Sequence, residues 1–541
     1  MNQPVREFRR VAERYWADYW KLFPDEASEA GFHEHDAELG ENGAPVWREH
    51  ARLMRNALAA VETLPDSAFT GDDWLDRRGF LSHLRTELHW NADLGRWRNE
   101  PQAHCNRAVN SILFLLIRNS DRLARIRPAI ESRLARIPRF LAQAAGCLRR
   151  PVPLWVRLTR ECCDGAIEFL EAVEEQLVPL SPKPEKTRAL IRAAAVAFDK
   201  YAEAAVRQRP GPAHAYAIGR EAFEFYIREK TGLPYSLPEA KALGEALVAR
   251  FEREVEIEAR KSGRRKARAI IEEAAARWAQ SSGPLFGTYQ QRTRDLRAAF
   301  ERARLVTFPK GERCRVLRVP PFLRTQIATA AYRQPGAFDR DQTGIFWVND
   351  PEETHGDPER RAAEVRQHFG LELTCAHEAY PGHHLQFAIQ NRHPSKLRRL
   401  FAHAIFYEGW TLWTEKMCVD QEIVTLPEAR LLQLHDALWR AHRIVIDCGL
   451  HDRSLSYAAA IRRLQEGVGF TAARARADVN WYTAAPTVPM SYLLGRLEVE
   501  KLHAHFVGSQ GWSLRRFNDW MLSFGAIPWA WIWESTLRPA A

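Results

Sequence analysis

Residues 371–416 read LELTCAHEAYPGHHLQFAIQNRHPSKLRRLFAHAIFYEGWTLWTEK, and the rest of the chain is organised around this stretch. It contains His377 and Glu378 side by side, then His383 and His384, and further on Glu408. Imidazole nitrogens and carboxylate oxygens are common ligands of Zn²⁺, and a catalytic zinc keeps one coordination position open for water. The combination predicts a zinc site of the kind that hydrolases use.

The spacing of the histidines differs from the H-E-x-x-H motif, whose two ligands lie four residues apart on one helix face. Four residues after His377 stands Pro381, and the next histidines follow at six and seven residues. On a regular helix His384 would share the face of His377 but lie about 10 Å further along, and His383 would point to another side. Neither arrangement fits one ion with bonds of about 2.1 Å.

Pro381 and Gly382 offer a way to bring the ligands together. Proline removes a backbone donor and clashes with the preceding turn, whereas glycine accepts backbone angles that other residues resist. We therefore expect a two-residue bulge at 380–382 that returns His383 to an effective i+4 position. His384 is the alternative second ligand.

The third ligand is expected from the later segment FYEGW, where Glu408 stands in an apolar and aromatic run. A buried carboxylate is costly unless it is paired or bound to a metal. Glu415, two turns later, is the competing third ligand. Glu378 is the natural general base, because zinc lowers the pKa of its bound water to about 7. Without Glu408, the histidines would be equally consistent with an ordinary solvated helix face.

The pattern HEAYPGHHLQ at 377–386, followed by FYEGWTLWTE at 406–415, resembles the DUF885 family. The similarity continues in order along the chain, in GIFWVN at 344–349, RIVIDCGLH at 443–451, Tyr482 with Pro486, SYLLG at 491–495 and the segment 517–528. The resemblance implies a zinc metallopeptidase with one Zn²⁺ per chain and a single helical domain over residues 1–541.

The chain departs from the family pattern in the loop before residue 491. Val488 stands where the family has Gln, and Thr487 stands where it has Gly. Trp413 replaces a residue that is often Tyr in the family. A polar contact with the substrate from this loop is therefore in question.

The late segment also supplies candidates for groups that peptide hydrolysis needs besides the metal and the base. Tyr492 and Tyr482 are candidate donors to the oxyanion, since similar helical zinc peptidases carry such a donor there and a phenol donates without being charged. Each is equally consistent with a core tyrosine whose hydroxyl is satisfied.

Basic and acidic residues of the same segment are further candidates. Arg443 and Arg496 suit a substrate carboxylate, because the guanidinium fork binds one bidentately. Asp447 and His451 share a helix face and are expected either to support the metal ligands from behind or to form a plain pair at a helix end.

The fold is expected to be mainly α, a large helical body with a central cleft and a small sheet beside the metal-binding helix. Whether this single body divides into two lobes, roughly 1–305 and 306–541, is left open by the sequence. The helical segments with the clearest periodicity are 4–23, 45–64, 72–98, 122–147, 152–178, 185–206, 286–304, 427–448, 455–466, 471–480 and 488–506. Residues 315–319 and 344–349 suit short strands. Gly344 and Phe346 are candidate substrate contacts, because an edge strand beside the metal helix would pair with extended substrate.

Bulk properties exclude several classes of protein. The net charge is +10, and basic residues cluster at 260–268. This cluster has neither the interleaved aromatic residues nor the known motif that nucleic-acid binding would need. The N-terminal sequence lacks the apolar core of a signal peptide, and no apolar run reaches the length of a membrane span. The eight cysteines show no paired spacing. These features predict a cytoplasmic protein with reduced thiols, no nucleic-acid partner and no membrane partner.

Three functions remain open from the sequence. The first is a zinc peptidase acting on short peptides in a deep cleft, as a carboxypeptidase or dipeptidase does. The second is a metal-dependent amidase whose substrate is a non-peptide amide or a cell-wall-derived peptide. The third is an inactive helical binding protein, with Pro381 and Gly382 marking a lost site. The sequence leaves the oligomeric state open.

Overall fold

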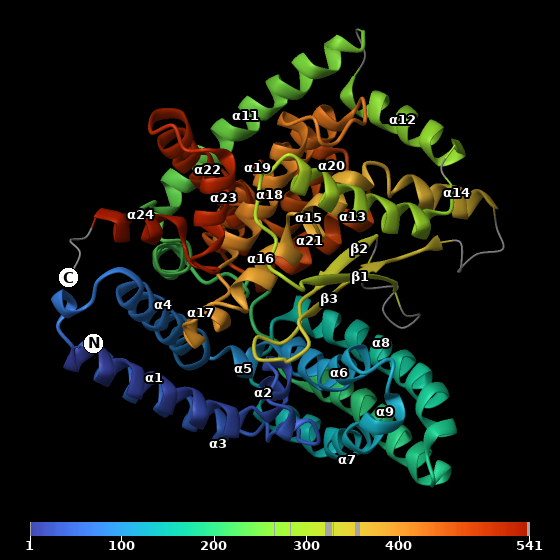
Figure 1. The fold of residues 1–541 in the computed structure, drawn as a ribbon. Coiled ribbons are helices and arrows are strands. Elements are labelled where there is room, and N and C mark those ends of the chain that lie inside the picture. Colours follow the sequence, from blue (N-terminus) through green and yellow to red (C-terminus); the bar gives the residue numbers. More distant parts are fainter. Residues whose placement is uncertain are drawn as a thin grey trace.

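The computed structural model describes residues 2–263, 266–281, 283–319, 327, 329–351 and 358–537 of the chain. Helices dominate these residues, and one three-stranded sheet lies between two groups of helices (Figure 1). The predicted fold class, mainly α with a small sheet, is confirmed. No helix in the described part of the chain is long and apolar enough to cross a bilayer. Of the basic cluster, Arg264 and Arg265 lie outside the described residues.

The N-terminal helices share a core with the segment that carries the candidate site. Those that contribute to this core are α1 (Gln3–Leu22), α3 (Ala44–Glu62) and α4 (Gly71–Leu88), whereas α2 (Pro24–Ala30) and α5 (Arg96–Asn99) lie in the same part of the chain outside that buried cluster. Phe8, Met54 and Phe80 belong to the same buried cluster as Leu385 and Trp410. The beginning of the chain therefore packs on the metal-binding segment and does not form a body of its own.

A second group of four helices has a separate core. These helices are α6 (Pro101–Arg118), α7 (Leu123–Cys147), α8 (Pro153–Leu177) and α9 (Pro184–Arg207). Their buried cluster includes Ile112, Leu134, Phe169 and Phe198. The expected segments 122–147, 152–178 and 185–206 match α7, α8 and α9 to within one residue at each end, because the apolar stripe of each helix is unbroken.

Four helices of the middle of the chain are α10 (Arg220–Tyr226), α11 (Leu237–Lys261), α12 (Ala267–Ser281) and α13 (Leu285–Arg302). α11 packs along α19 (Ala429–His451), and α13 packs on α15 (Leu371–Glu378). In Figure 1 they lie with the C-terminal helices, although they precede residue 305. Helices from before and after residue 305 therefore pack together, and the chain does not divide into two lobes at that residue.

The sheet has the order β1-β3-β2, with β3 in the centre. Its strands are β1 (Arg313–Arg318), β2 (Ala330–Arg333) and β3 (Thr343–Val348). β1 is parallel to β3, and β2 is antiparallel to it, with Tyr332 opposite Phe346. Side chains of a strand alternate between faces: Phe346 and Val348 face the core of the metal-binding segment, and Trp347 faces the α6–α9 core.

The remaining helices complete the C-terminal part. They are α14 (Pro358–Arg366), α16 (His383–Gln390), α17 (Lys396–Leu400), α18 (Ala404–Asp420), α20 (Tyr457–Val468), α21 (Ala472–Ala484), α22 (Val488–His503), α23 (Leu514–Leu522) and α24 (Trp529–Leu537). Most residues of α18 are buried, including the carboxylates Glu408 and Glu415. This position in the core places Glu408 deep inside the molecule.

Candidate metal centre

The chain between the two candidate histidines is a break between helices. α15 ends at Glu378 and α16 begins at His383, so the bulge expected within one continuous helix is wrong in form. The Tyr380–Pro381 peptide bond is cis, and the Pro381 carbonyl accepts a hydrogen bond of 2.8 Å from Trp410 Nε1. A Cβ atom at position 382 would lie 1.8 Å from the His377 carbonyl oxygen, so this tight approach requires Gly382.

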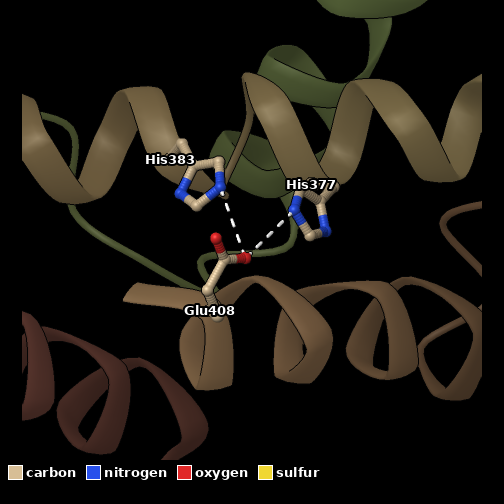
Figure 2. A group of neighbouring side chains, drawn as sticks. All are labelled: His377, His383 and Glu408. Carbon is tan, nitrogen blue, oxygen red and sulfur yellow. Dashed lines mark ion pairs between the residues drawn. The ribbon is translucent and has the colours of Figure 1, made fainter. Parts of the chain in front are cut away.

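The break brings three side chains to one point. His377 Nε2 and His383 Nε2 lie 3.6 and 3.7 Å from Glu408 Oε2, and one donor atom from each of the three lies within 4.8 Å of the others. Figure 2 shows Glu408 reaching from α18 toward both rings. The side chains are only 11%, 12% and 9% exposed, in that order.

These separations fit one zinc ion. They are too long for hydrogen bonds, yet they approach the spacing of about 3.4 Å between ligand atoms on a tetrahedron with bonds of 2.0–2.1 Å. Two imidazole nitrogens and a carboxylate oxygen form a donor set that zinc accepts, and they leave a fourth coordination position for water or substrate. Among the described residues, no other group of His, Cys, Asp and Glu meets the same criterion.

Glu415, the competing third ligand, lies on the opposite side of the His377 ring. Its Oε1 is 2.7 Å from His377 Nδ1, whereas His377 Nε2 faces Glu408. A carboxylate on the second ring nitrogen fixes the tautomer and the orientation of a metal-binding histidine. The position of Glu415 is the one expected for a residue that supports a ligand from behind.

His384, the alternative second ligand, points away from the cluster. Its Nε2 lies 2.7 Å from Glu312 Oε2, and its Nδ1 lies 3.2 Å from the Tyr332 hydroxyl. Glu312 also accepts hydrogen bonds from Tyr380 and Arg297. These partners outweigh the effect of burial and lower the pKa of Glu312 to about 2.

Glu312 and Tyr332 were not found from the sequence. Glu312 lies 72 residues before His384, and no motif surrounds it. Tyr332 belongs to β2, a four-residue strand without clear alternation. The sequence carries no local signal for either residue, because their contacts with α15 and α16 arise only in the folded chain.

Glu378 is held beside the cluster by the edge strand β2. Its Oε2 accepts a hydrogen bond of 2.9 Å from the backbone N of Tyr332. Burial, together with the nearby Glu408 carboxylate, raises the pKa of Glu378 to about 7, although His377 and the Tyr332 hydrogen bond act in the opposite direction. A carboxyl with this pKa can both accept and return a proton near neutrality.

The two histidine rings have different affinities for a proton. Burial disfavours the charged form of His377, but the carboxylates of Glu408 and Glu415 outweigh burial and raise its pKa to about 10. Burial lowers the pKa of His383 to about 4. Because metals bind the neutral ring, an ion at this point would compete with the proton on His377 and meet little competition at His383.

Tyr492 faces Glu408 from α22. Burial raises the pKa of its phenol well above the ordinary value, and the Glu408 carboxylate, to which it is hydrogen-bonded, adds to this effect. α18 and α22 approach very closely where Gly409 meets Gly495: a Cβ atom on Gly495 would lie 2.2 Å from the Ile405 carbonyl oxygen. This backbone contact sets the distance between Glu408 and Tyr492.

Tyr482 and Arg443 lie behind Tyr492. The Tyr482 hydroxyl donates to Asp478 at 2.8 Å and accepts a hydrogen bond from Arg443 Nε at 2.9 Å. The Arg443 guanidinium lies 4.6 Å from the centre of the Tyr492 ring. Tyr482 therefore has a fully engaged hydroxyl in a buried network. Arg443 Nη1 is buried without a hydrogen-bond partner in the described part of the structure, so its contact with a substrate carboxylate stays a prediction.

Asp447 and His451 support the start of α22. Asp447 accepts hydrogen bonds from the backbone N of Thr487 and of Met490, at 3.3 and 3.2 Å. His451 Nε2 lies 3.2 Å from the Tyr482 carbonyl oxygen and 3.7 Å from Asp447 Oδ1. The pair positions the helix that carries Tyr492, and in the described part of the chain no hydrogen bond or ion pair joins it to the candidate metal ligands.

Arg496 is engaged elsewhere. Its Nε lies 2.8 Å from Glu500 Oε1 on the same helix, and the guanidinium lies 5.8 Å from the centre of the Phe251 ring. The guanidinium is therefore already paired, and the predicted contact of Arg496 with a substrate carboxylate has no support from its position.

The strand predicted to pair with substrate is the wrong one. β3 lies between β1 and β2, so its backbone groups are already used. Gly344 lies against His384 and Tyr332, where a Cβ atom would approach both within 2.5 Å, and Phe346 is fully buried against Tyr289. The edge that faces the cluster belongs to β2, which the sequence did not predict.

Two cavities lie near the cluster, on the side of the N-terminal helices. The larger, about 640 Å³, is lined by α1, α2, α6 and the loop after β2. The smaller, about 260 Å³, is lined in part by Tyr407, whose ring is 5.9 Å from that of His383. Both cavities include Trp16, Glu87 and Leu400 in their walls. They adjoin each other, but their described walls include none of the three candidate metal ligands, so a central cleft at the metal site stays a prediction.

A family profile described as "Bacterial protein of unknown function (DUF885)" matches residues 24–534. The chain belongs to the DUF885 family. The resemblance found in the sequence motifs is thus confirmed for the family, whose description assigns it no function.

Two solved structures have a similar fold. One is described as "a putative lipoprotein of unknown function from Shewanella oneidensis", with a TM-score of 0.77, 18% identity, and coverage of 98% of this chain and 100% of that chain. The other is "the putative lipoprotein from Colwellia psychrerythraea", with a TM-score of 0.77, 17% identity, and coverage of 99% of each chain. At these identities the likeness shows the fold alone. Among curated protein sequences, none is significantly similar to this chain.

Proposed function

We propose that this protein is a zinc-dependent peptidase that hydrolyses short peptides. The observation that carries the proposal is the meeting of His377 Nε2, His383 Nε2 and Glu408 Oε2 within 4.8 Å, with Glu378 adjacent in sequence. Glu415 on the second nitrogen of His377 adds the support that metal-binding histidines generally have. An inactive relic would have no need to keep this set of donors together.

His377, His383 and Glu408 would hold the ion, which would supply a Lewis acid for the scissile carbonyl and for the attacking water. Glu378 accepts a proton from that water as it attacks, and then passes the proton to the leaving amine. Its pKa of about 7 suits both steps. The hydrogen bond from the backbone N of Tyr332 keeps the carboxylate oriented.

Tyr492 is the proposed donor to the oxyanion of the tetrahedral adduct, a role in which its hydroxyl leaves Glu408, to which it is hydrogen-bonded here, once that carboxylate holds the ion. Burial and the Glu408 carboxylate keep its phenol protonated, and a protonated donor in a buried site stabilises developing negative charge strongly. Arg443 lies against the Tyr492 ring and orients it. Tyr482 holds Arg443 in turn.

Short peptides are favoured as substrates because the site is deep. The three candidate ligands are about one-tenth exposed, so the backbone of a folded protein is too bulky to reach them. The adjoining cavities of about 640 and 260 Å³ offer room for a few residues of an extended chain.

The experiment that tests the proposal combines metal analysis with peptide digestion. We expect elemental analysis of protein purified without chelator to give about one zinc per chain, and His377→Ala to lose it. Incubation with a mixture of short peptides, followed by mass spectrometry, should reveal products that Glu378→Gln protein does not form. Protein that binds no zinc even when it is supplied would contradict the proposal and favour the helical binding protein.

The cellular location is also a proposal. The sequence features predict the cytoplasm, whereas both similar solved structures are described as putative lipoproteins. Cells that express the untagged protein can be separated into soluble and membrane fractions. An immunoblot of the two fractions then distinguishes a cytoplasmic protein from a membrane-attached one.

A further inference from the structure

The cavity of about 260 Å³ lies one helical turn from the candidate reacting groups. Ala404 and Val488 are part of its wall. Ala404 precedes Glu408 by one turn of α18, and Val488 precedes Tyr492 by one turn of α22, a rise of about 6 Å in each case. A peptide whose scissile bond lies at the metal ligands therefore has the cavity within one or two residues, since an extended residue spans about 3.3–3.6 Å.

Four aliphatic hydroxyl groups of the cavity wall are already used as donors. Ser82 donates to the Glu229 carbonyl, Thr86 to Ser82, Thr487 to Pro486 and Ser491 to Thr487, each through its hydroxyl. Because a hydroxyl has one hydrogen to donate, these four groups have none left for a ligand. Val488 offers no polar group at all.

Lys230 is the charged donor of the wall, beside the neutral groups of Trp16, whose Nε1 is buried without a hydrogen-bond partner in the described structure, and of Tyr407. The residue lines the cavity, and the described contacts of its ammonium are with aromatic rings: Nζ lies 4.7 Å from the centre of the Tyr226 ring and 6.0 Å from that of Trp90. Among the described residues, no ion pair or hydrogen bond engages it. Burial lowers its pKa, while the more distant carboxylates of Glu87 and Asp447 act in the opposite direction.

The other titratable groups of the wall do not replace Lys230. Glu87 is the one acidic residue among the described wall residues, and Asn91 donates to it at 3.2 Å. His83 is packed on Trp16, and burial lowers the pKa of His403 to about 4, so that its ring is neutral. Among the described residues of this cavity wall, Lys230 therefore supplies the positive charge.

We infer that Lys230 binds the C-terminal carboxylate of the peptide, which makes the enzyme an exopeptidase that cleaves one or two residues from a free C-terminus. The inference rests on the proposed peptidase function. A carboxylate is the ligand that satisfies a half-buried ammonium without another hydrogen-bonding or ionic partner. This assignment also accounts for the absence of a polar side chain at Val488. The charge that recognises the substrate then comes from Lys230, in the turn after α10, and not from the loop before α22.

Two paired probes test the inference: N-acetyl-trialanine with a free C-terminus, and the same peptide as its C-terminal amide. Binding is measured by calorimetry on zinc-supplied Glu378→Gln protein, in which turnover is blocked, so the readout does not depend on catalysis. We expect the acid to bind at least about tenfold more tightly than the amide, and Lys230→Met to remove this difference while leaving amide binding unchanged. Lys230→Arg should retain part of it.

Hydrolysis of the same pair by protein with Glu378 intact gives the second readout. We expect Lys230→Met to lower kcat/KM for the acid about 10-fold to 100-fold through KM, with zinc content and circular dichroism unchanged. Lys266→Met, at an exposed lysine outside the cavity wall, serves as the matched control and should alter neither probe.

The outcomes separate this inference from the proposed function. Equal binding of acid and amide, or an acid preference that survives Lys230→Met, would overturn the inference even if peptides are hydrolysed. Acid binding that depends on Lys230 in a protein that hydrolyses nothing would support the carboxylate site and contradict the peptidase. An acid preference that follows an acidic side chain in place of the C-terminus, seen with N-acetyl-aspartyl-alanine amide, would also overturn it.

Discussion

Glu415 Oε1 lies 2.7 Å from His377 Nδ1, on the ring nitrogen opposite the one that faces Glu408. An ion held by the other ring nitrogen, Nε2, would complete a carboxylate–imidazole–metal arrangement. The two carboxylates of α18 thus act on the two nitrogens of one ring. The role of each can be separated by substitution.

Glu415→Gln should weaken zinc binding without removing a ligand. The amide still reaches Nδ1 but no longer favours the orientation and basicity of the ring, so we expect a loss of about 10-fold to 100-fold in zinc affinity. Competition with a chromophoric chelator measures it. Glu466→Gln, at an exposed residue of α20, is the control. An affinity equal to that of the unmodified protein would show that Glu415 has no such role.

Glu378→Gln should abolish turnover and keep the metal. An amide cannot accept the proton of the attacking water, so kcat should fall by about 10²-fold to 10⁴-fold. Zinc content by elemental analysis should stay near one per chain, because Glu378 is not among the converging donors. Peptide hydrolysis close to that of the unmodified protein would assign the base to another residue.

His383→Ala and His384→Ala should fail in different ways. His383→Ala should lose zinc yet remain folded, since its ring is a candidate ligand. His384→Ala leaves the buried Glu312 without one of its partners, which should cost about 1–3 kcal/mol of stability. Thermal denaturation and metal analysis of both variants distinguish these effects. Loss of zinc from His384→Ala, with a normal melting temperature, would exchange the roles assigned to the two histidines.

Tyr492→Phe should lower kcat by about 100-fold to 1,000-fold with little change in KM, because it removes a donor that acts in the transition state. Steady-state kinetics on a cleaved peptide measures both constants. Tyr482→Phe removes a hydroxyl that is engaged with Asp478 and Arg443, so it should affect stability more than kcat. Equal losses of kcat in the two variants would contradict the assignment of Tyr492 as the donor.

Because the pKa of Glu100 is shifted by folding, we expect the free energy of unfolding to depend on pH. Burial raises its pKa to about 7 in the folded protein, above the value of about 4.3 expected in the unfolded chain. Between these two values the folded state binds more protons, so the contribution of this group to stability falls as the pH rises through this window and is constant above it. Glu100→Gln should therefore raise the melting temperature more at pH 8 than at pH 4.5.

The control for this prediction is Glu13→Gln, at an exposed residue of α1. It should leave the melting temperature unchanged at both pH values. If Glu100→Gln raises the melting temperature equally at pH 4.5 and pH 8, removal of the buried negative charge is not the cause of the increase.

The sequence predicts the features of the site that depend on local pattern. His377, Glu378 and Glu408 could be chosen from residue type and from the apolar surroundings of Glu408 alone. Pro381 and Gly382 indicated that the backbone departs from a regular helix, which is correct, although the departure is a complete break between α15 and α16.

The features that depend on long-range pairing could not be predicted. Glu312 meets His384 across 72 residues, and β3 is central because β1 and β2 both pair with it. A strand pattern shows which residues alternate but not which neighbours they meet. The same limit applies to the lobe boundary, since α11 packs on α19 far along the chain.

The contact between Gly409 and Gly495 has a consequence for altering this protein by design. The two backbones touch there, so no adjustable side chain sets the spacing of Glu408 and Tyr492. Ala404 and Val488 stand on the same two helices one turn away, in the wall of the smaller cavity. Libraries confined to these two positions would therefore reshape what the cavity accepts while the spacing of the reacting groups stays fixed by the glycines.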